Sequence, residues 1–266
     1  MFKATPFEDV LQITLCKYEE MVPGAVVSAY LVDGLLIDTG PAHTAEELTD
    51  FLAGKTLTVV ANTHHHEDHI AANKFLQDRF GVDIFAPPLA VSKINQTPEL
   101  YPYQEEVWGY PVPSIVIPLG RSISTEKYHF DVISTPGHDR DHICLFDAKN
   151  GRLFSGDLFL GTKPVASRPM EDNWQTVEDL KRIRALNPKV IFSASGLVVN
   201  DPIQRLDKVI AALEAIGNTV TNLHQNGMTP RQIMTEFFGK EAPIAERTQA
   251  QFSSENMVKC FLIGQA

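Results

Sequence analysis

Short apolar runs separated by turn residues fill the first third of the chain, a pattern typical of β-strands joined by turns. Residues 10–17, 25–32 and 35–40 form three such runs. Asp33-Gly34, between the last two, is a typical pair for a two-residue hairpin turn. The pattern therefore predicts strands that follow one another through tight turns.

Beyond residue 40 the pattern alternates between helical and strand periods. Residues 42–53 and 67–80 have the spacing of helices, whereas 57–63 and 82–86 are apolar runs typical of strands. Such a β-to-α succession favours sheets covered by helices.

A second block of short strand-like runs comes later, with Asn150-Gly151 as a hairpin signal between its last two members. Its runs lie at 114–119, 128–135, 142–148 and 151–156. Two separate blocks of strands predict two sheets.

The C-terminal part, residues 201–266, is predicted to be mainly helical. Asp201 is a good N-cap and Pro202 fits the first helical position. An apolar face then repeats with helical period up to Gly217, where we expect the helix to end. Thr229, followed by a proline, predicts the start of another helix.

Residues 87–118 interrupt the regular pattern with seven prolines. The same segment carries Tyr101, Tyr103, Trp108 and Tyr110. This composition predicts an irregular loop or broken helix, either a lid over a site or a surface excursion packed on the core. Because no Gly/Ser-rich linker divides the chain, we expect a single domain over residues 1–266.

Composition narrows the class of protein. The 266 residues, 44% of them hydrophobic, can bury a substantial core, and a formal charge of −10 without basic clusters argues against nucleic acid as a partner. Cys16, Cys144 and Cys260 have no metal or disulfide spacing, so we expect buried free thiols. With neither a signal peptide nor a membrane-length apolar run, a cytoplasmic protein without membrane contact is expected. A homodimer stays open.

The run THHHEDH, residues 63–69, lies where a predicted strand ends and a predicted helix begins. A strand fixes the backbone there, while the following turn lets alternate side chains converge. Imidazoles and carboxylates at this spacing predict a site for one or two metal ions, and a histidine-rich surface patch is the weaker alternative. TPGH, ending at His138, and FSGD, ending at Asp157, each add one ligand type on a turn that contains glycine.

The order THHHEDH, TPGH and FSGD, with LLIDTG near the start, resembles the metallo-β-lactamase superfamily from about residue 25 to the helix after Asp201. The resemblance implies an α/β (α+β) fold, a four-layer αββα sandwich with the metal site where the two sheets meet. It also implies roles for seven residues. His64, His66 and His138 would bind a first metal, Asp68 and His69 a second, Asp157 would bridge the two, and Asp38 would orient the ligands.

The pattern departs from the family at Ser195, which stands where the family supplies a further histidine to the second metal. A neutral hydroxyl is a poor zinc ligand, so the second metal should bind more weakly than the first. The number and type of bound ions stay open: two metal ions, one metal ion, or two ions that tolerate oxygen ligands. We favour two ions narrowly, since three of their ligands remain, with zinc first and manganese or iron as alternatives.

The implied chemistry is hydrolysis by water that a metal activates, with Asp68 orienting the water or taking its proton. We predict a metallo-hydrolase that acts on an ester, thioester, lactone or similar acyl bond of a small molecule. A phosphodiesterase of the same fold is an alternative, and so is a metal-binding or ligand-binding module with little turnover.

Several neighbouring side chains have less specific interpretations. The aromatic residues of 87–118 could line an apolar pocket, and Lys163 or Arg168 could meet an anionic group, although a solvated surface is favoured for these two cations. His65 and Glu67 are predicted to face solvent or to cap the helix. His142 is predicted to be a hydrogen-bonded structural histidine rather than a ligand.

Overall fold

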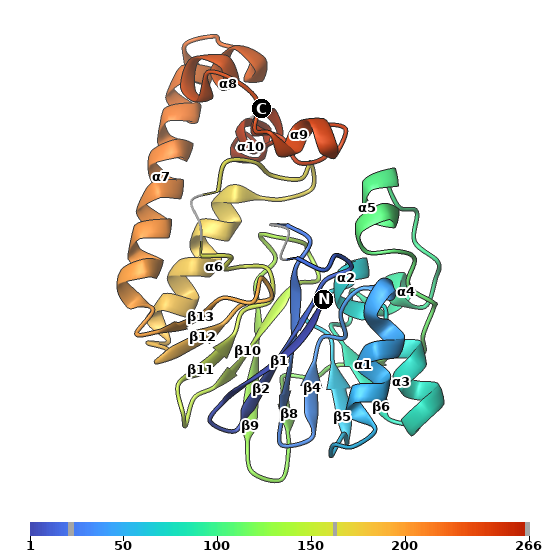
Figure 1. The fold of residues 1–266 in the computed structure, drawn as a ribbon. Coiled ribbons are helices and arrows are strands. Elements are labelled where there is room, and N and C mark those ends of the chain that lie inside the picture. Colours follow the sequence, from blue (N-terminus) through green and yellow to red (C-terminus); the bar gives the residue numbers. More distant parts are fainter. Residues whose placement is uncertain (21–23, 162–163, 264–266) are drawn as a thin grey trace. The chain divides into compact units, whose positions relative to one another are not determined.

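The computed structural model describes residues 1–20, 24–161 and 164–263 (Figure 1). Its internal contacts divide the chain into two units. The first unit comprises Met1–Ser134, Asp141–Leu160 and Lys189–Asn200. The second comprises Thr135–Arg140, Gly161–Pro188 and Asp201–Ala266. The expectation of a single domain stays a prediction.

The first unit contains a seven-stranded sheet in which neighbours in the chain are also neighbours in space. Its strands are β1 (Phe2–Phe7), β2 (Val10–Leu15), β3 (Val27–Val32), β4 (Leu35–Ile37), β5 (Val59–Ala61), β6 (Asp83–Ala86) and β7 (Ile117–Pro118). The strands pair antiparallel from β1 to β4 and parallel from β4 to β7. Asp33 and Gly34 have φ values of 46° and 83°, as a tight hairpin between twisted strands requires.

A second sheet of six strands belongs to the same unit, in the order β13-β12-β11-β10-β9-β8. Its strands are β8 (Ser122–Ser124), β9 (His129–Ser134), β10 (Ile143–Asp147), β11 (Arg152–Phe154), β12 (Val190–Phe192) and β13 (Val198–Asn200). The two predicted sheets are therefore present. The assignment of 114–119 to the second sheet was wrong, because Ile117 pairs with Phe85 of β6 in the first.

Apolar side chains from both sheets form one buried cluster between them. Tyr30 of β3 contacts Phe154 and Phe192 edge to face, with ring centroids 5.6 Å and 5.4 Å apart. Phe154 and Phe192 stack on each other at 4.9 Å. The sheets therefore pack face to face, and the loops that follow β4, β5 and β11 start from a rigid base.

Helices cover the other face of the first sheet. They are η1 (Ala42–Thr44), α1 (Ala45–Leu52), α2 (Glu67–Ile70), α3 (Asn73–Phe80), α4 (Val91–Ile94) and α5 (Pro102–Val107). Leu48, Leu76 and Ile94 join the buried cluster on this face. The single helix expected over 67–80 is broken into α2 and α3, because the Ala71 N–H donates to the Gly40 carbonyl at 3.0 Å and so leaves the helical ladder.

The second unit is helical, as predicted for the C-terminal part. Its helices are α6 (Asn173–Ala185), α7 (Ile203–Gln225), α8 (Pro230–Phe238), α9 (Ile244–Arg247) and α10 (Ser254–Phe261). Among the residues described, no helix combines the length and apolarity needed to cross a bilayer. The three cysteines are free and buried.

Two details of α7 correct the prediction, whereas the start of α8 confirms it. Asp201 has a φ of 49° and Pro202 takes the N-cap position without a side-chain cap. The helix continues through Gly217, where a Cβ would lie 2.6 Å from the Trp174 ring. Gly217 therefore allows close packing and does not end the helix. Thr229 caps α8 with a reciprocal capping box.

Candidate metal centre

The histidine loop, which we define as residues 63–69, runs from the end of β5 to the first turn of α2. It stays extended at His66 (φ −62°, ψ 146°) and becomes helical at Glu67. His64 is fully buried and His66 is 9% exposed. An extended stretch sends alternate side chains the same way, which explains why these two histidines point into one place.

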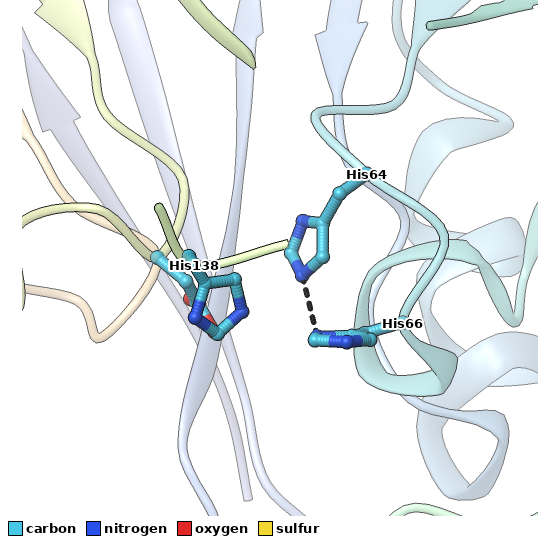
Figure 2. A group of neighbouring side chains, drawn as sticks. His64, His66 and His138 are labelled. Atoms are coloured by element: carbon cyan, nitrogen blue, oxygen red, sulfur yellow. Dashed lines mark hydrogen bonds between the residues drawn. The ribbon is translucent and has the colours of Figure 1, made fainter. Parts of the chain in front are cut away.

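His64, His66 and Asp157 each offer a ligand atom, and the three atoms lie within 4.8 Å of one another. Figure 2 shows the two imidazoles turned toward each other, with His64 Nε2 and His66 Nδ1 sharing a hydrogen bond of 2.8 Å. Asp157 comes from the turn after β11, far away in sequence. The first unit thus assembles two imidazoles and a carboxylate around one point.

Asp38, which follows β4, holds this loop in place. Its carboxylate accepts hydrogen bonds from the backbone N–H of Thr63 at 2.7 Å and from the Thr63 hydroxyl at 2.8 Å. It also accepts the Nδ1 proton of His69 at 2.8 Å. Because Nδ1 donates to Asp38, Nε2 is the nitrogen of His69 that is left for another partner, either a proton or a metal ion. Asp38 therefore has the orienting position that was expected of it.

His69 Nε2 faces two carboxylates, Asp157 Oδ1 at 3.4 Å and Asp68 Oδ2 at 3.7 Å. Burial by itself would lower the pKa of this imidazole, but the charges of Asp68, Asp38 and Asp157 outweigh that effect and raise the pKa well above its ordinary value. The site therefore has an excess of negative charge that a proton or a cation can balance.

These residues fit a divalent cation. Within the described chain, His69 Nε2 is fully buried and has no hydrogen-bond partner, although two carboxylates lie near it. Imidazole nitrogens and carboxylate oxygens are the ligands of zinc, manganese and iron in proteins. A cation at this point would take the place of a proton on Nε2 and balance the carboxylates.

The turn that carries Asp157 is fixed by His142. The Asp157 backbone N–H donates to His142 Nε2 at 3.1 Å, and His142 is fully buried. Gly156, with φ of 48°, lets the backbone pass this ring, since a Cβ there would lie 2.5 Å from His142 Nε2. His142 is thus a hydrogen-bonded structural histidine, as predicted.

His138, also labelled in Figure 2, belongs to the second unit, so its role as a third ligand stays a prediction. Within that unit the Gly137 N–H donates to Asp179 at 2.8 Å, and His138 Nδ1 lies 3.5 Å from Glu171 Oε1. A carboxylate at Nδ1 commonly orients a metal-binding histidine through Nε2. Glu171 and Asp179 had no motif in the sequence that pointed to them.

A sequence profile described as the metallo-beta-lactamase superfamily matches residues 22–195, more than half of the chain. The chain belongs to the metallo-β-lactamase superfamily. It is 30% identical to a probable metallo-hydrolase of Bacillus subtilis over 195 residues, which cover 68% of this chain and 86% of that protein. The expected family is therefore confirmed.

Other relatives match over shorter stretches. The chain is 34% identical to a hydroxyacylglutathione hydrolase of Thermosynechococcus vestitus over 108 residues, which are 41% of this chain and 37% of that protein. The match therefore spans less than two thirds of that relative. A solved metallo-β-lactamase family protein of Thermus thermophilus superposes with a TM-score of 0.69 at 20% identity, over 96% of this chain and 93% of that one. This likeness confirms the expected fold.

Ser195, which was expected to stand in place of a histidine ligand, lies in a segment that we call the serine turn, residues 193–196. Ser195 is half-buried, and its hydroxyl shares a hydrogen bond of 3.0 Å with that of Ser193. The Ala194 N–H donates to the Gly156 carbonyl at 3.1 Å, so the serine turn lies against the turn that carries Asp157. The replacement of a histidine ligand by Ser195 stays a prediction, and the structure shows that its turn is hydrogen-bonded to the turn of Asp157.

Glu67 and His65 of the histidine loop are more buried, and have more partners, than the prediction of solvent-facing or capping side chains implied. Glu67 does not face solvent but is 4% exposed, and its carboxylate accepts a hydrogen bond of 2.7 Å from Gln104. His65 is only partly exposed, and its Nδ1 lies 2.8 Å from the buried Asp141, which Lys93 also reaches at 3.0 Å. The partners come from distant segments, so the local sequence gave no sign of them.

Lys163 and Arg168 are the two cations that could meet an anionic group. Lys163 lies outside the described residues. The Arg168 guanidinium lies 4.7 Å from the Phe252 ring centroid, within the second unit. This cation–π contact gives Arg168 a packing role.

Proposed function

We propose that the protein is a metal-dependent hydrolase that cleaves an ester, thioester, lactone or similar acyl bond of a small molecule. The convergence of His64, His66 and Asp157 on one point carries this proposal. Withdrawing imidazoles and carboxylates from water costs free energy, and a cation bound between them offsets that cost.

The ligands divide between two positions. His64 and His66 would hold a first ion, with His138 as the third ligand, while Asp68 and His69 would hold a second and Asp157 would contact both. A divalent ion, zinc in the first place, supplies Lewis acidity that polarises a carbonyl group and brings the pKa of water toward about 7. Because Ser195 replaces an imidazole, we propose that the second position binds its ion more weakly.

The protein's own groups prepare the reaction around these ions. Asp38 keeps the Nδ1 proton of His69 in place, which directs the lone pair of Nε2 inward. Asp68 is 6% exposed at the first turn of α2, where its carboxylate can orient a water molecule or accept its proton. Burial of these groups excludes bulk water and strengthens their electrostatic effect.

The names of the relatives favour acyl bonds. The hydroxyacylglutathione hydrolases and the probable metallo-hydrolase are, by their names, hydrolases. A hydroxyacyl derivative of glutathione is an acyl compound, which supports a carbonyl rather than a phosphoryl centre as the group attacked in this protein.

Turnover of a substrate panel tests the proposal. The zinc-loaded protein is assayed on a phenyl ester, a thioester, a lactone and a phosphodiester, with metal content measured on the same samples. We expect acyl hydrolysis that a chelator removes and zinc restores, and a fall in kcat of about 100-fold or more for Asp68→Asn. Asp78→Asn, the same change at an exposed site on α3, should keep full activity.

Two outcomes contradict the proposal. Turnover of the phosphodiester alone would identify the phosphodiesterase alternative. Full metal content without turnover of any substrate would favour a binding module.

A further inference from the structure

Exposed apolar side chains gather in residues 87–118. Of the eleven large hydrophobic residues that the described chain exposes, six lie in this segment. They are Leu89, Tyr101, Tyr110, Val112, Ile115 and Ile117. The segment thus exposes more apolar side chains than the rest of the described chain together.

Helix α5 organises the aromatic part of this segment. Tyr101 is 46% exposed at its N-cap, and the Tyr101 and Tyr103 rings stack with centroids 6.2 Å apart and planes inclined by 14°. Trp108, buried at the end of the helix, supports Tyr103 edge to face at 6.1 Å. We call the Tyr101–Tyr103 pair the aromatic platform.

A buried hydrogen bond ties the aromatic platform to the histidine loop. Gln104 is 8% exposed and uses both ends of its amide. Its Oε1 accepts from the Tyr101 N–H at 2.9 Å, and its Nε2 donates to Glu67 Oε1 at 2.7 Å. Glu67 precedes Asp68 directly, so one side chain connects the platform to the residue before a proposed metal ligand.

The other end of α5 is attached to the segment that follows Asp38. The Ala42 N–H donates to the Trp108 carbonyl at 2.8 Å, and His43 Nε2 donates to the Glu106 carbonyl at 3.1 Å. Gly109 allows this approach, since a Cβ there would lie 3.1 Å from the Ala42 methyl group. Helix α5 is therefore anchored to both loops that build the proposed centre.

We propose that the aromatic platform binds a planar apolar group of the substrate, and that the Glu67–Gln104 hydrogen bond holds the platform in position for it. This inference rests on the proposed hydrolase function and names a substrate class for it. The Gln104 amide satisfies the buried Glu67 carboxylate, so removing that amide would leave a buried acceptor without its donor.

Charge around the platform refines the ligand class. Glu105 and Glu106 are exposed on α5, one turn from the tyrosines. Carboxylates there repel an anionic substrate, whereas stacked tyrosine rings favour a neutral aryl or other flat apolar group. We therefore assign the platform to an uncharged aromatic portion of an ester or thioester.

A swapped pair tests the role of the hydrogen bond. Gln104→Glu alone sets two buried carboxylates against each other, whereas Glu67→Gln alone keeps an acceptor oxygen for Gln104. In the double variant Glu67→Gln/Gln104→Glu, the amide at 67 donates to the carboxylate at 104, whose other oxygen still accepts from the Tyr101 N–H. The double variant should therefore rescue the single Gln104→Glu change.

Amide hydrogen exchange of residues 101–108 measures how firmly the Glu67–Gln104 hydrogen bond holds helix α5, and it needs no substrate. We expect exchange to rise about tenfold in Gln104→Glu, to change little in Glu67→Gln, and to return to the original rate in the double variant. Equal exchange in all four proteins, or failure of the double variant to restore protection in a folded protein, would overturn the positioning role.

Selectivity tests the platform itself. We expect Tyr101→Ala/Tyr103→Ala to lower kcat/KM for S-benzyl thioacetate about tenfold, mainly through KM, and to leave S-ethyl thioacetate unchanged. Leu89→Ala, which removes exposed apolar area elsewhere in the segment, should change neither value.

An equal loss of kcat/KM on both substrates, or no loss on either, would overturn the substrate-binding role of the aromatic platform while the proposed hydrolysis stands. Absence of turnover in the unaltered protein would instead refute the proposed function, and the exchange result would still decide the positioning role.

Discussion

The histidine loop and the serine turn are both fixed by buried hydrogen bonds, yet they offer different chemistry. Asp38 holds the histidine loop through Thr63 and His69. The serine turn is held through its backbone: the Ser28 N–H donates to the Ala194 carbonyl at 2.7 Å, and the Tyr30 hydroxyl donates to the Ser193 carbonyl at 2.5 Å. One segment presents imidazoles and the other an alcohol.

The difference lies in which groups hold each segment. The Gln12 amide donates to the Gly196 carbonyl at 2.7 Å, so the serine turn is held through its backbone and does not depend on the side chain of Ser195. In the histidine loop, by contrast, the same Asp38 carboxylate supports both the backbone and His69, a proposed ligand. A change in the loop should therefore disturb the fold and the metal together, and a change at Ser195 only the metal.

The largest effect is expected for Asp38→Ala. The change leaves the Thr63 N–H, the Thr63 hydroxyl and His69 Nδ1 without their acceptor, which should lower the free energy of unfolding by about 3 kcal/mol or more. Zinc content should fall as well, because His69 loses its orientation. Denaturant unfolding of the metal-free protein and metal analysis measure the two effects. Full zinc binding by a folded variant would show that the loop does not depend on Asp38.

A pair of glycine substitutions compares the turn that carries Asp157 with the serine turn that is hydrogen-bonded to it. Gly156→Ala places a Cβ 2.5 Å from His142 Nε2 at a φ of 48°, so it should destabilise the protein by about 2 kcal/mol and displace Asp157. Gly196→Ala, at a φ of 85° but 3.1 Å from the Ser28 hydroxyl, should cost about 1 kcal/mol and leave metal content unchanged. Thermal unfolding and metal analysis measure which substitution destabilises the protein more and which lowers its metal content. A larger effect of Gly196→Ala would contradict this expectation.

A gain rather than a loss, about tenfold in affinity for a second ion, is expected for Ser195→His. Since the backbone of the serine turn is already closed, an imidazole there should add a ligand without refolding the segment. Titration with zinc, followed calorimetrically, measures the second affinity. Ser195→Ala removes the same hydroxyl and adds no ligand, so it should show no gain. Equal affinities in the two variants would mean that position 195 does not reach the ion.

The sequence by itself determined the family, the two groups of strands and the residues of the histidine loop. These features depend on local order: a strand that ends in THHHEDH, a turn such as Asn150-Gly151, and a capping sequence such as that at Thr229. Each of them acts over a few residues, so the pattern carries the information directly.

Only the tertiary structure decided which distant groups support that site. His142 reaches the turn of Asp157, and Gln104 reaches Glu67, across long stretches of chain. Asp38 was expected to orient the ligands, but its hydrogen bonds with Thr63 and His69 appear only in the structure. The sequence predicted that Glu67 faces solvent or caps the helix and that a helix ends at Gly217, because burial and close packing depend on partners that no local pattern reveals. Hydrogen-bond satisfaction in a folded core is a property of the whole arrangement, and that is the physical reason for the division.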